Sequence, residues 1–198
     1  KVGYSCLKEG HTSGSRADMF KFRIHAPRYT CDQIMRHSVG TAINCQSQRY
    51  VDMDDNFSIY IPPKAMENET LQTYYKYYEN SCKNHYKLVR RELRNDGIEG
   101  EKANDIMRTM LPIGVACNLT MGFTVEALMN FMHKRLCVRA DEPIRQVAKL
   151  MRKAVIDVEP RYADLLIPQC VDKMYCPEKH SCGAYPSKEE VHKKIFGK

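Results

Sequence analysis

Residues 36–50 read RHSVGTAINCQSQRY, and this stretch indicates more about the fold and the function than any other part of the chain. It holds two arginines, a histidine, three amide side chains and several hydroxyls, whereas its apolar residues are too few and too irregularly spaced for a core element. Arginine forms paired hydrogen bonds with phosphate oxygens, and amides and hydroxyls suit the polar edge of a ring. The stretch therefore indicates a binding site for an anionic ligand, and a solvated polar loop is the alternative.

The composition is that of a packed globular protein with an anionic partner. The 198 residues fit one domain, 43% of them are apolar, and the formal net charge is +7. The basic residues are scattered rather than gathered in a run of Lys and Arg. This pattern favours a small phosphorylated ligand at least as much as nucleic acid.

Cysteine usage and hydropathy predict a cytoplasmic protein without a membrane segment. Nine cysteines without a signal peptide argue against a complete disulfide framework and favour reduced thiols. No apolar run approaches the about 20 residues that a membrane helix needs. The first residue is Lys1 rather than Met, and we expect that the natural chain begins earlier.

The C-terminal part of the chain contains Cys170, Cys176 and Cys182, and five residues separate each cysteine from the next. Paired cysteines in zinc sites are usually separated by about two to four residues. We therefore favour free thiols or an incidental disulfide over a metal site in this part of the chain.

The periodicity of the apolar side chains predicts both helices and strands. Alternation predicts strands at residues 19–25 and 57–61, and an apolar run predicts a buried strand at residues 113–123. Helical spacing predicts helices at residues 29–38, 69–94, 101–110, 124–137 and 141–160. Thr124 and Asp141 stand where N-caps would be. The tyrosine-rich face of residues 69–94 fits a core or a subunit interface better than a platform for stacking bases.

Five sequence motifs follow one another along the chain. They are Gly10-His11-Thr12-Ser13, Gln33-x-x-Arg36-His37, Asn44-x-x-Ser47-x-Arg49-Tyr50-Val51, Leu111-Pro112, and Asn130-Phe131-x-x-x-Arg135-Leu136-Cys137-x-Arg139-Ala140. Together they resemble the flavin-dependent thymidylate synthases over about residues 10–183. We therefore expect one synthase-like domain over residues 1–183 and a basic C-terminal tail over residues 184–198.

The resemblance implies an α+β fold in which a mainly antiparallel central sheet is flanked by helices. This single domain would assemble as a homotetramer, with active sites where subunits meet. The implied activity is that of an FAD-dependent thymidylate synthase, a methyltransferase that converts dUMP to dTMP. Methylenetetrahydrofolate would donate the carbon and NADPH would reduce the flavin. The implied partners are dUMP, folate and further copies of the chain.

The resemblance also implies roles for individual residues. Arg135 would be catalytic, because it would lie against the uracil and stabilise the negative charge that develops when hydride reaches the ring. The nucleotide would be bound by Gln33, Arg36, Ser47, Gln48, Arg49 and Arg135, with Gln33 and Arg36 reaching it from a neighbouring subunit. FAD would be bound by His11, Ser13, Arg36, His37, Ser38, Asn44, Asn130 and Arg139. No metal ligand and no protein nucleophile is required, because hydride transfer is the chemistry of the cofactor.

Several positions depart from the usual pattern of the family, among them Ser38, Cys45, Asn118, Thr124 and Glu126. Glu126 stands where Arg is common, and reversing a charge beside a pyrophosphate weakens its binding. The departures leave open a relative that modifies another pyrimidine nucleotide, and a non-catalytic nucleotide- or nucleic-acid-binding protein on the same scaffold. A zinc-dependent interaction module built on the three C-terminal cysteines is a third alternative.

Overall fold

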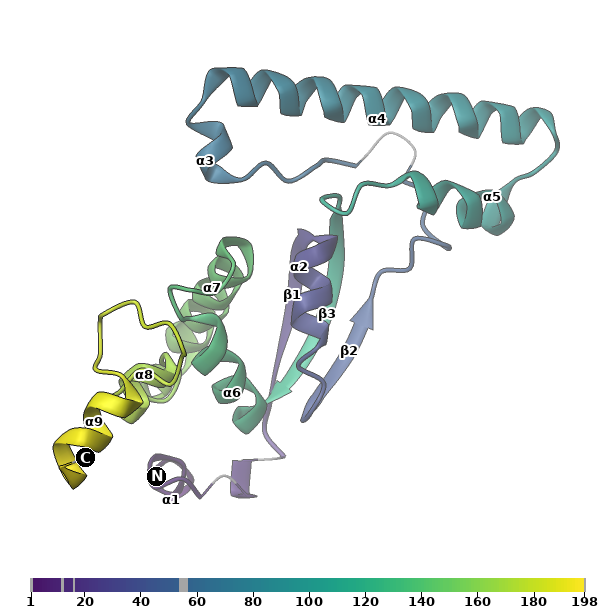
Figure 1. The fold of residues 1–198 in the computed structure, drawn as a ribbon. Coiled ribbons are helices and arrows are strands. Elements are labelled where there is room, and N and C mark those ends of the chain that lie inside the picture. The colour runs from purple at the N-terminus through teal and green to yellow at the C-terminus, as the bar shows by residue number, and fades with distance from the viewer. Residues whose placement is uncertain (1, 12, 16, 54–56, 198) are drawn as a thin grey trace. The chain divides into compact units, whose positions relative to one another are not determined.

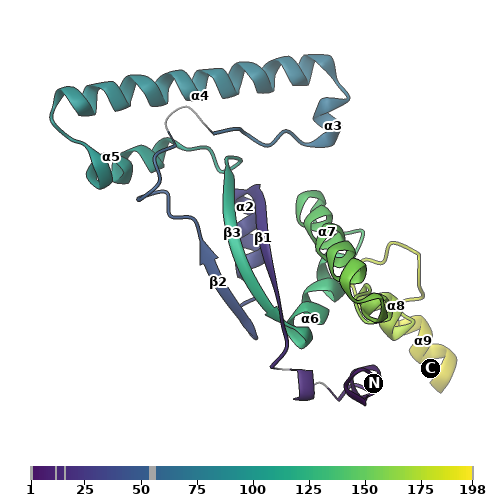
Figure 2. The same ribbon diagram turned by 180° about the vertical axis from the view of Figure 1, so that it is seen from behind.

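Three strands form the sheet of the protein: β1 (Met19–Pro27), β2 (Thr41–Cys45) and β3 (Ala116–Thr124). Their spatial order is β1-β3-β2, and Figures 1 and 2 show the sheet from opposite sides. The structure is a computed structural model that describes residues 2–11, 13–15, 17–53 and 57–197. Thr12 of the first motif lies outside the described residues.

Backbone hydrogen bonds show that the strands are antiparallel. The amides of Gln46 and Thr124 donate to the carbonyls of Asn118 and Gly40, at 2.8 and 2.9 Å. Residue numbers therefore fall along one strand as they rise along the other, which is the antiparallel pattern. The expected α+β fold with an antiparallel sheet is confirmed.

Helices make up most of the remaining described chain. They are α1 (Val2–Lys8), α2 (Arg28–Met35), α3 (Pro63–Met66), α4 (Glu69–Asn95), α5 (Gly100–Met107), α6 (Val125–Arg135), α7 (Glu142–Val158), α8 (Gln169–Lys173) and α9 (Lys188–Phe196). Short 3-10 turns lie at Ser13–Ser15, Arg108–Met110 and Pro160–Asp164. No helix within the described ranges is long and apolar enough to cross a membrane.

The chain divides into two compact units, and each strand contributes residues to both. The first unit consists of Lys1–Phe22, Gln33–Ile43 and Thr120–Lys198. The second unit consists of Arg23–Asp32 and Asn44–Leu119.

One face of β3 is covered by helices, and this explains the burial pattern of the strand. Cys117, Leu119, Met121 and Phe123 are buried, whereas Asn118 and Thr120 between them are exposed. In the first unit, Phe131 of α6 packs against Phe123 with ring centroids 5.3 Å apart. In the second unit, Cys31 of α2 donates to the carbonyl of Cys117 at 3.7 Å. Odd-numbered residues of β3 therefore face the helices, as the period of two requires.

Helix α4 contributes to a separate apolar cluster in the second unit. Tyr86 is buried there together with Phe57, Ile59 and Met107. The rings of Phe57 and Tyr86 meet edge to face, with centroids 5.6 Å apart. This contact anchors the middle of the 27-residue helix that the apolar spacing predicts.

The structure corrects two predictions about strands. Residues 41–45 form β2, although the sequence of this stretch was interpreted as too irregular for a regular element. The reason is that β2 lies at the edge of the sheet and is mostly exposed, so its side chains carry no apolar alternation. The strand predicted at residues 57–61 is wrong, because only Ile59 forms an isolated bridge, with Val115.

Several helix boundaries also differ from the prediction. Helix α2 ends at Met35 rather than at residue 38. Thr124 caps α6 as expected, since its side chain accepts a hydrogen bond from the amide of Ala127. Asp141 occupies the capping position of α7, but its side chain makes no capping hydrogen bond. The basic C-terminal tail contains a helix that the apolar pattern did not predict, namely α9.

We expect Phe123→Ala to lower the free energy of unfolding by about 3–5 kcal/mol, because it leaves a cavity beneath α6. Urea unfolding of the purified variant measures this loss. Val158→Ala is the control, since Val158 is 81% exposed and its truncation should cost less than about 0.5 kcal/mol. Equal stability of the two variants would contradict the proposed packing.

Candidate functional site

The loop between α2 and β2 makes a close approach to the start of α6. Gly40 has a φ of +71°, and its carbonyl accepts a hydrogen bond from the amide of Thr124. A Cβ atom at Gly40 would lie 2.8 Å from Oγ1 of Thr124 and 3.1 Å from Cβ of Ala127. Both the backbone conformation and the lack of space therefore require glycine at this position. The Thr41 hydroxyl donates to the carbonyl of His37 at 2.9 Å and fixes the preceding turn.

His37 and Arg135, which are 98 residues apart in sequence, form a hydrogen bond. Nε of Arg135 donates to Nε2 of His37 at 3.0 Å. The imidazole also lies edge-on to the ring of Phe131, with centroids 5.0 Å apart. The structure thus brings together one residue predicted to bind the flavin and the residue predicted to be catalytic.

Burial and charge keep the imidazole of His37 neutral. Burial, followed by the positive charges of Arg135 and Lys134, lowers the pKa of His37 to about 4. A neutral ring whose Nε2 accepts a hydrogen bond carries its proton on Nδ1. Burial, together with the charge of Arg36, lowers the pKa of Arg135. Arg36 and Arg135 therefore repel each other, and binding of an anionic ligand would reduce this repulsion.

A pocket of about 540 Å³ lies beside this loop in the first unit. It is lined by Val39, Gly40, Thr124, Glu126, Ala127 and Asn130. Asn130 and Val39 are exposed, and the amide of Asn130 is available to a ligand. Glu126 also lines the pocket, so the charge reversal noted in the sequence lies at the pocket itself.

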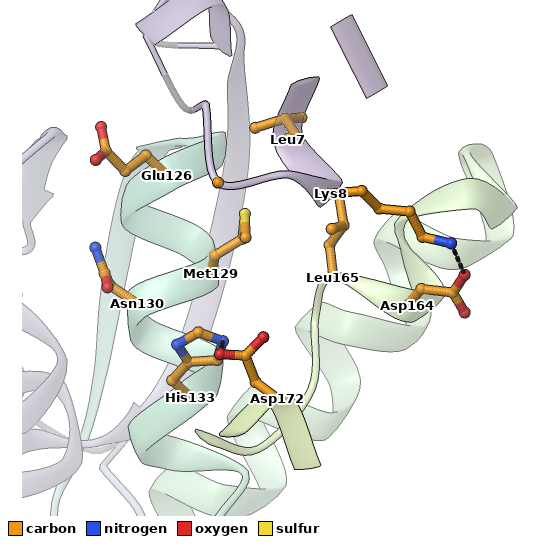
Figure 3. A pocket seen from close by; sticks show the side chains of 10 residues that line it. Leu7, Lys8, Glu126, Met129, Asn130, His133, Asp164, Leu165 and Asp172 are labelled. Atoms are coloured by element: carbon orange, nitrogen blue, oxygen red, sulfur yellow. Dashed lines mark ion pairs between the residues drawn. The ribbon is translucent and has the colours of Figure 1, made fainter. Parts of the chain in front are cut away.

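A second pocket of about 260 Å³ shares Glu126 and Asn130 with the first. Figure 3 shows both residues on α6 with His133 one turn further along the helix, and Leu7 of α1 on another side of the pocket. Nε2 of His133 lies 4.0 Å from a carboxylate oxygen of Asp172, and burial lowers the pKa of the imidazole. Sequence analysis missed His133, although its position three residues after Asn130 places both on one face of α6.

Arg49, in the second unit, is held by helix α5. Its guanidinium lies 3.5 Å from a carboxylate oxygen of Glu101 and 3.2 Å from one of Asp105. The hydroxyl of Ser47 accepts the amide hydrogen of Arg49 at 3.2 Å. The structure thus joins two of the predicted phosphate-binding residues in one tight turn.

Two buried side chains fix the backbone of that turn. Nδ2 of Asn104 donates to the carbonyl of Arg49 at 2.9 Å. Oδ1 of Asn104 accepts from Arg90 at 2.8 Å, and Arg90 also pairs with Asp52. Arg90 is only 4% exposed, so its charge needs these partners. Sequence analysis missed both residues. The available signal was an arginine four residues after Tyr86, on the apolar face of its helix.

Asn118 occupies a position where a basic residue would help to bind phosphate. Its side chain instead forms hydrogen bonds within the second unit. Its Nδ2 donates to Oε1 of Gln46 at 2.6 Å, and its Oδ1 lies 2.9 Å from Nδ1 of His25. Asn118 thus replaces a charge with an amide that is hydrogen-bonded on both sides.

The other predicted site residues have varied surroundings. Arg139 donates from Nη1 to the carbonyl of His180 at 2.8 Å, which ties it to the C-terminal segment. The side chains of His11, Ser13, Arg36, Ser38 and Asn44 are exposed, and those of Gln33 and Gln48 are partly buried. Within the described ranges, no group of three or more His, Cys, Asp and Glu side chains is arranged to hold a metal ion.

Comparison with known proteins places this arrangement in a family. The family model described as thymidylate synthase complementing protein matches residues 2–161. The flavin-dependent thymidylate synthase of Nitratidesulfovibrio vulgaris is 30% identical over 190 residues, covering 94% of this chain and 77% of the relative. The enzyme of the same name from Clostridium tetani is 31% identical, and the match covers 94% of this chain and 78% of that relative. The flavin-dependent thymidylate synthase of Sulfurisphaera tokodaii is 29% identical, and the match covers 83% of this chain and 61% of that relative.

The matched region contains the His37–Arg135 pair, the Gly40 loop between α2 and β2, and the Ser47–Arg49 turn. The resemblance inferred from the motifs is therefore confirmed by a family model over residues 2–161 and by relatives that cover up to 94% of the chain. The chain belongs to the thymidylate synthase complementing protein family.

Proposed function

We propose that the protein is an FAD-dependent thymidylate synthase that converts dUMP to dTMP. Methylenetetrahydrofolate would donate the carbon and NADPH would reduce the flavin. The observation that carries the proposal is the Arg135 guanidinium, hydrogen-bonded to a neutral His37 in the unit that also contains the glycine-lined pocket. A cation oriented by a neutral acceptor suits a reaction in which negative charge develops on a ring.

The residues of the pocket fit a flavin. Its volume of about 540 Å³ lies in the usual range for cofactor sites. Gly40 lines the pocket without a side chain, and the amide of Asn130 can pair with a ring edge. We propose that His11, Ser13, Arg36, His37, Ser38, Asn44, Asn130 and Arg139 hold FAD, which would supply the hydride chemistry that no side chain provides. Glu126 would repel the pyrophosphate and reduce affinity.

The proposed nucleotide site uses the Ser47–Arg49 turn. Ser47, Gln48 and Arg49 would bind the phosphate of dUMP, which would compete with Glu101 and Asp105 for the guanidinium of Arg49. Arg135 would lie against the pyrimidine and stabilise the charge that develops on it. Holding the substrate in register with these groups is the main task of the protein.

The proposed assembly is a homotetramer, in which Gln33 and Arg36 reach the nucleotide of a neighbouring subunit. Helix α4 supports an assembly, because Tyr74, Tyr77 and Tyr78 are 65%, 74% and 50% exposed along it. Apolar and aromatic side chains gathered on one helix are typical of an interface between chains.

The function is tested by incubating the purified protein with FAD, NADPH, methylenetetrahydrofolate and dUMP and separating the products by chromatography. We expect dTMP, and none when NADPH, methylenetetrahydrofolate or dUMP is omitted. A product formed only from another pyrimidine nucleotide would contradict the assignment of dUMP as the substrate. Salt-sensitive binding of oligonucleotides without flavin uptake or product would contradict the enzyme.

We expect Arg135→Ala to lower kcat by about 100- to 1,000-fold, because it removes the charge that stabilises the reacting ring. The FAD content of the purified variant should be unchanged, since the proposed partner of Arg135 is the nucleotide. Lys134→Ala is the control on the same helix, because Lys134 is exposed. A variant that turns over normally, or that has simply lost its flavin, would contradict the catalytic role.

We expect Asn104→Ala to raise the KM for dUMP by about tenfold while kcat changes little, because losing a buried hydrogen bond that fixes the turn costs about 1–2 kcal/mol. Initial rates over a range of dUMP concentrations separate the two constants. Val89→Ala, in the apolar cluster of α4, is the control for destabilisation away from the turn. If both variants raise KM equally, Asn104 has no positioning role.

We expect His37 to make the protein less stable as the pH falls from about 6.5 to 4. The pKa of His37 is about 4 in the folded protein and near 6.5 when unfolded, so the unfolded chain binds the proton first. Stability is therefore fully present above pH 6.5 and is lost towards pH 4, by about 1–2 kcal/mol for a half-buried group. Urea unfolding of His37→Gln, which cannot titrate, should lack this part of the pH dependence. Identical pH profiles would contradict the assignment.

A further inference from the structure

Cys45 of β2 and Cys117 of β3 are neighbours in the second unit. Their Sγ atoms lie 3.5 Å apart, although the residues are 72 positions apart in sequence. Strands β2 and β3 pair with each other, so the contact is set by the sheet. A disulfide requires the two sulfurs to approach to about 2.05 Å, which is a movement that side-chain rotation can provide.

A guanidinium group faces both sulfurs. Nη1 of Arg28 lies 3.7 Å from Sγ of Cys45 and 4.0 Å from Sγ of Cys117. Nε of the same side chain pairs with Asp32 at 3.0 Å, and this contact holds Arg28 in place. A positive charge at this distance stabilises a thiolate, which is the reactive form of cysteine.

The protonation of the cluster is unequal. Hydrogen bonds from Cys31 and Cys45, together with the charge of Arg28, lower the pKa of Cys117 to about 6. Burial and the neighbouring Cys117 raise the pKa of Cys45 to about 11. At neutral pH the pair therefore carries one proton, which Cys45 holds at rest, and one negative charge, which rests on Cys117.

We propose that Cys45 and Cys117 form a peroxide-reactive thiol pair that closes to a disulfide. Cys45 is partly exposed, whereas Cys117 is only 2% exposed, so hydrogen peroxide meets the sulfur of Cys45. Transfer of the Cys45 proton to Cys117 across the 3.5 Å contact leaves the thiolate on the more exposed Cys45, and this thiolate attacks one peroxide oxygen. An S–O bond forms, the O–O bond breaks, and the departing hydroxide takes a proton from solvent.

The second step joins the two sulfurs. The sulfur of Cys117 attacks that of Cys45, the S–S bond forms, and the S–O bond breaks. The departing hydroxide takes the proton of Cys117 and becomes water. In total the two thiol groups lose two electrons, and hydrogen peroxide is reduced to two molecules of water.

The cross-link would fasten β2 to β3 beside Asn44 and two residues before Ser47. We expect it to weaken dUMP binding, and this consequence alone rests on the proposed function. The thiol chemistry does not rest on it, so the two are measured separately.

The test exposes the reduced, folded, full-length protein to an equivalent of hydrogen peroxide. Remaining thiols are then alkylated, and the digest is examined by mass spectrometry without reduction. We expect a linked peptide pair that contains Cys45 and Cys117, two hydrogens lighter than the separate peptides, which a thiol reductant releases. Cys45→Ser and Cys117→Ser should abolish it, whereas Cys182→Ser, at an exposed thiol, should leave it unchanged.

Arg28→Gln supplies a second readout. Removing the guanidinium should raise the pKa of the Cys117 thiol by about one unit, which slows cross-linking about twofold at neutral pH and up to about tenfold below about pH 6. Oxidation of Cys45 to a sulfinic acid without a link, or links only among other cysteines, would overturn the proposal whatever the enzyme activity. A normal link with unchanged dUMP binding would overturn only the proposed consequence.

Discussion

Strand β3 is hydrogen-bonded to a neighbouring strand on each side, and the rest of the structure depends on this pairing. At the C-terminal end of β3, the amide of Thr124 donates a hydrogen bond to the carbonyl of Gly40. The side chain of Thr124 caps α6, the helix that carries Asn130 and Arg135. Towards its N-terminal end, Cys117 and Asn118 contact Cys45 and Gln46. A single strand therefore places residues from distant parts of the sequence beside one another in each unit.

The arginines near β3 have two kinds of partner. The Arg135 guanidinium is oriented by an imidazole that burial keeps neutral, so the two do not repel each other. Arg49 and Arg90 are instead paired with carboxylates. Arg135 thus differs from Arg49 and Arg90 in the kind of partner that holds it. The hydrogen-bond acceptor of Arg135 is a neutral imidazole rather than a carboxylate, so this contact leaves the positive charge of Arg135 uncompensated. A group that stabilises a transient negative charge needs such a charge.

Much of the fold could be predicted from the sequence, because long elements leave a regular apolar pattern. Helix α4 and strands β1 and β3 were predicted for that reason. Strand β2 was missed because an exposed edge strand has no buried face to impose a pattern. The motifs predicted the residues of the candidate site, including both members of the His37–Arg135 pair. The partners of Arg49 could not be predicted, because Glu101, Asn104 and Asp105 lie on another element and meet it only through tertiary packing.

The proposed function requires that these residues hold a flavin and use it on a pyrimidine nucleotide. The most direct measurement is the visible absorbance spectrum of the purified protein, recorded without oxygen before and after NADPH and then dUMP with methylenetetrahydrofolate are added. We expect a yellow protein that NADPH bleaches and whose colour returns only when both substrates are present. A colourless protein that takes up no added FAD would contradict the proposed function.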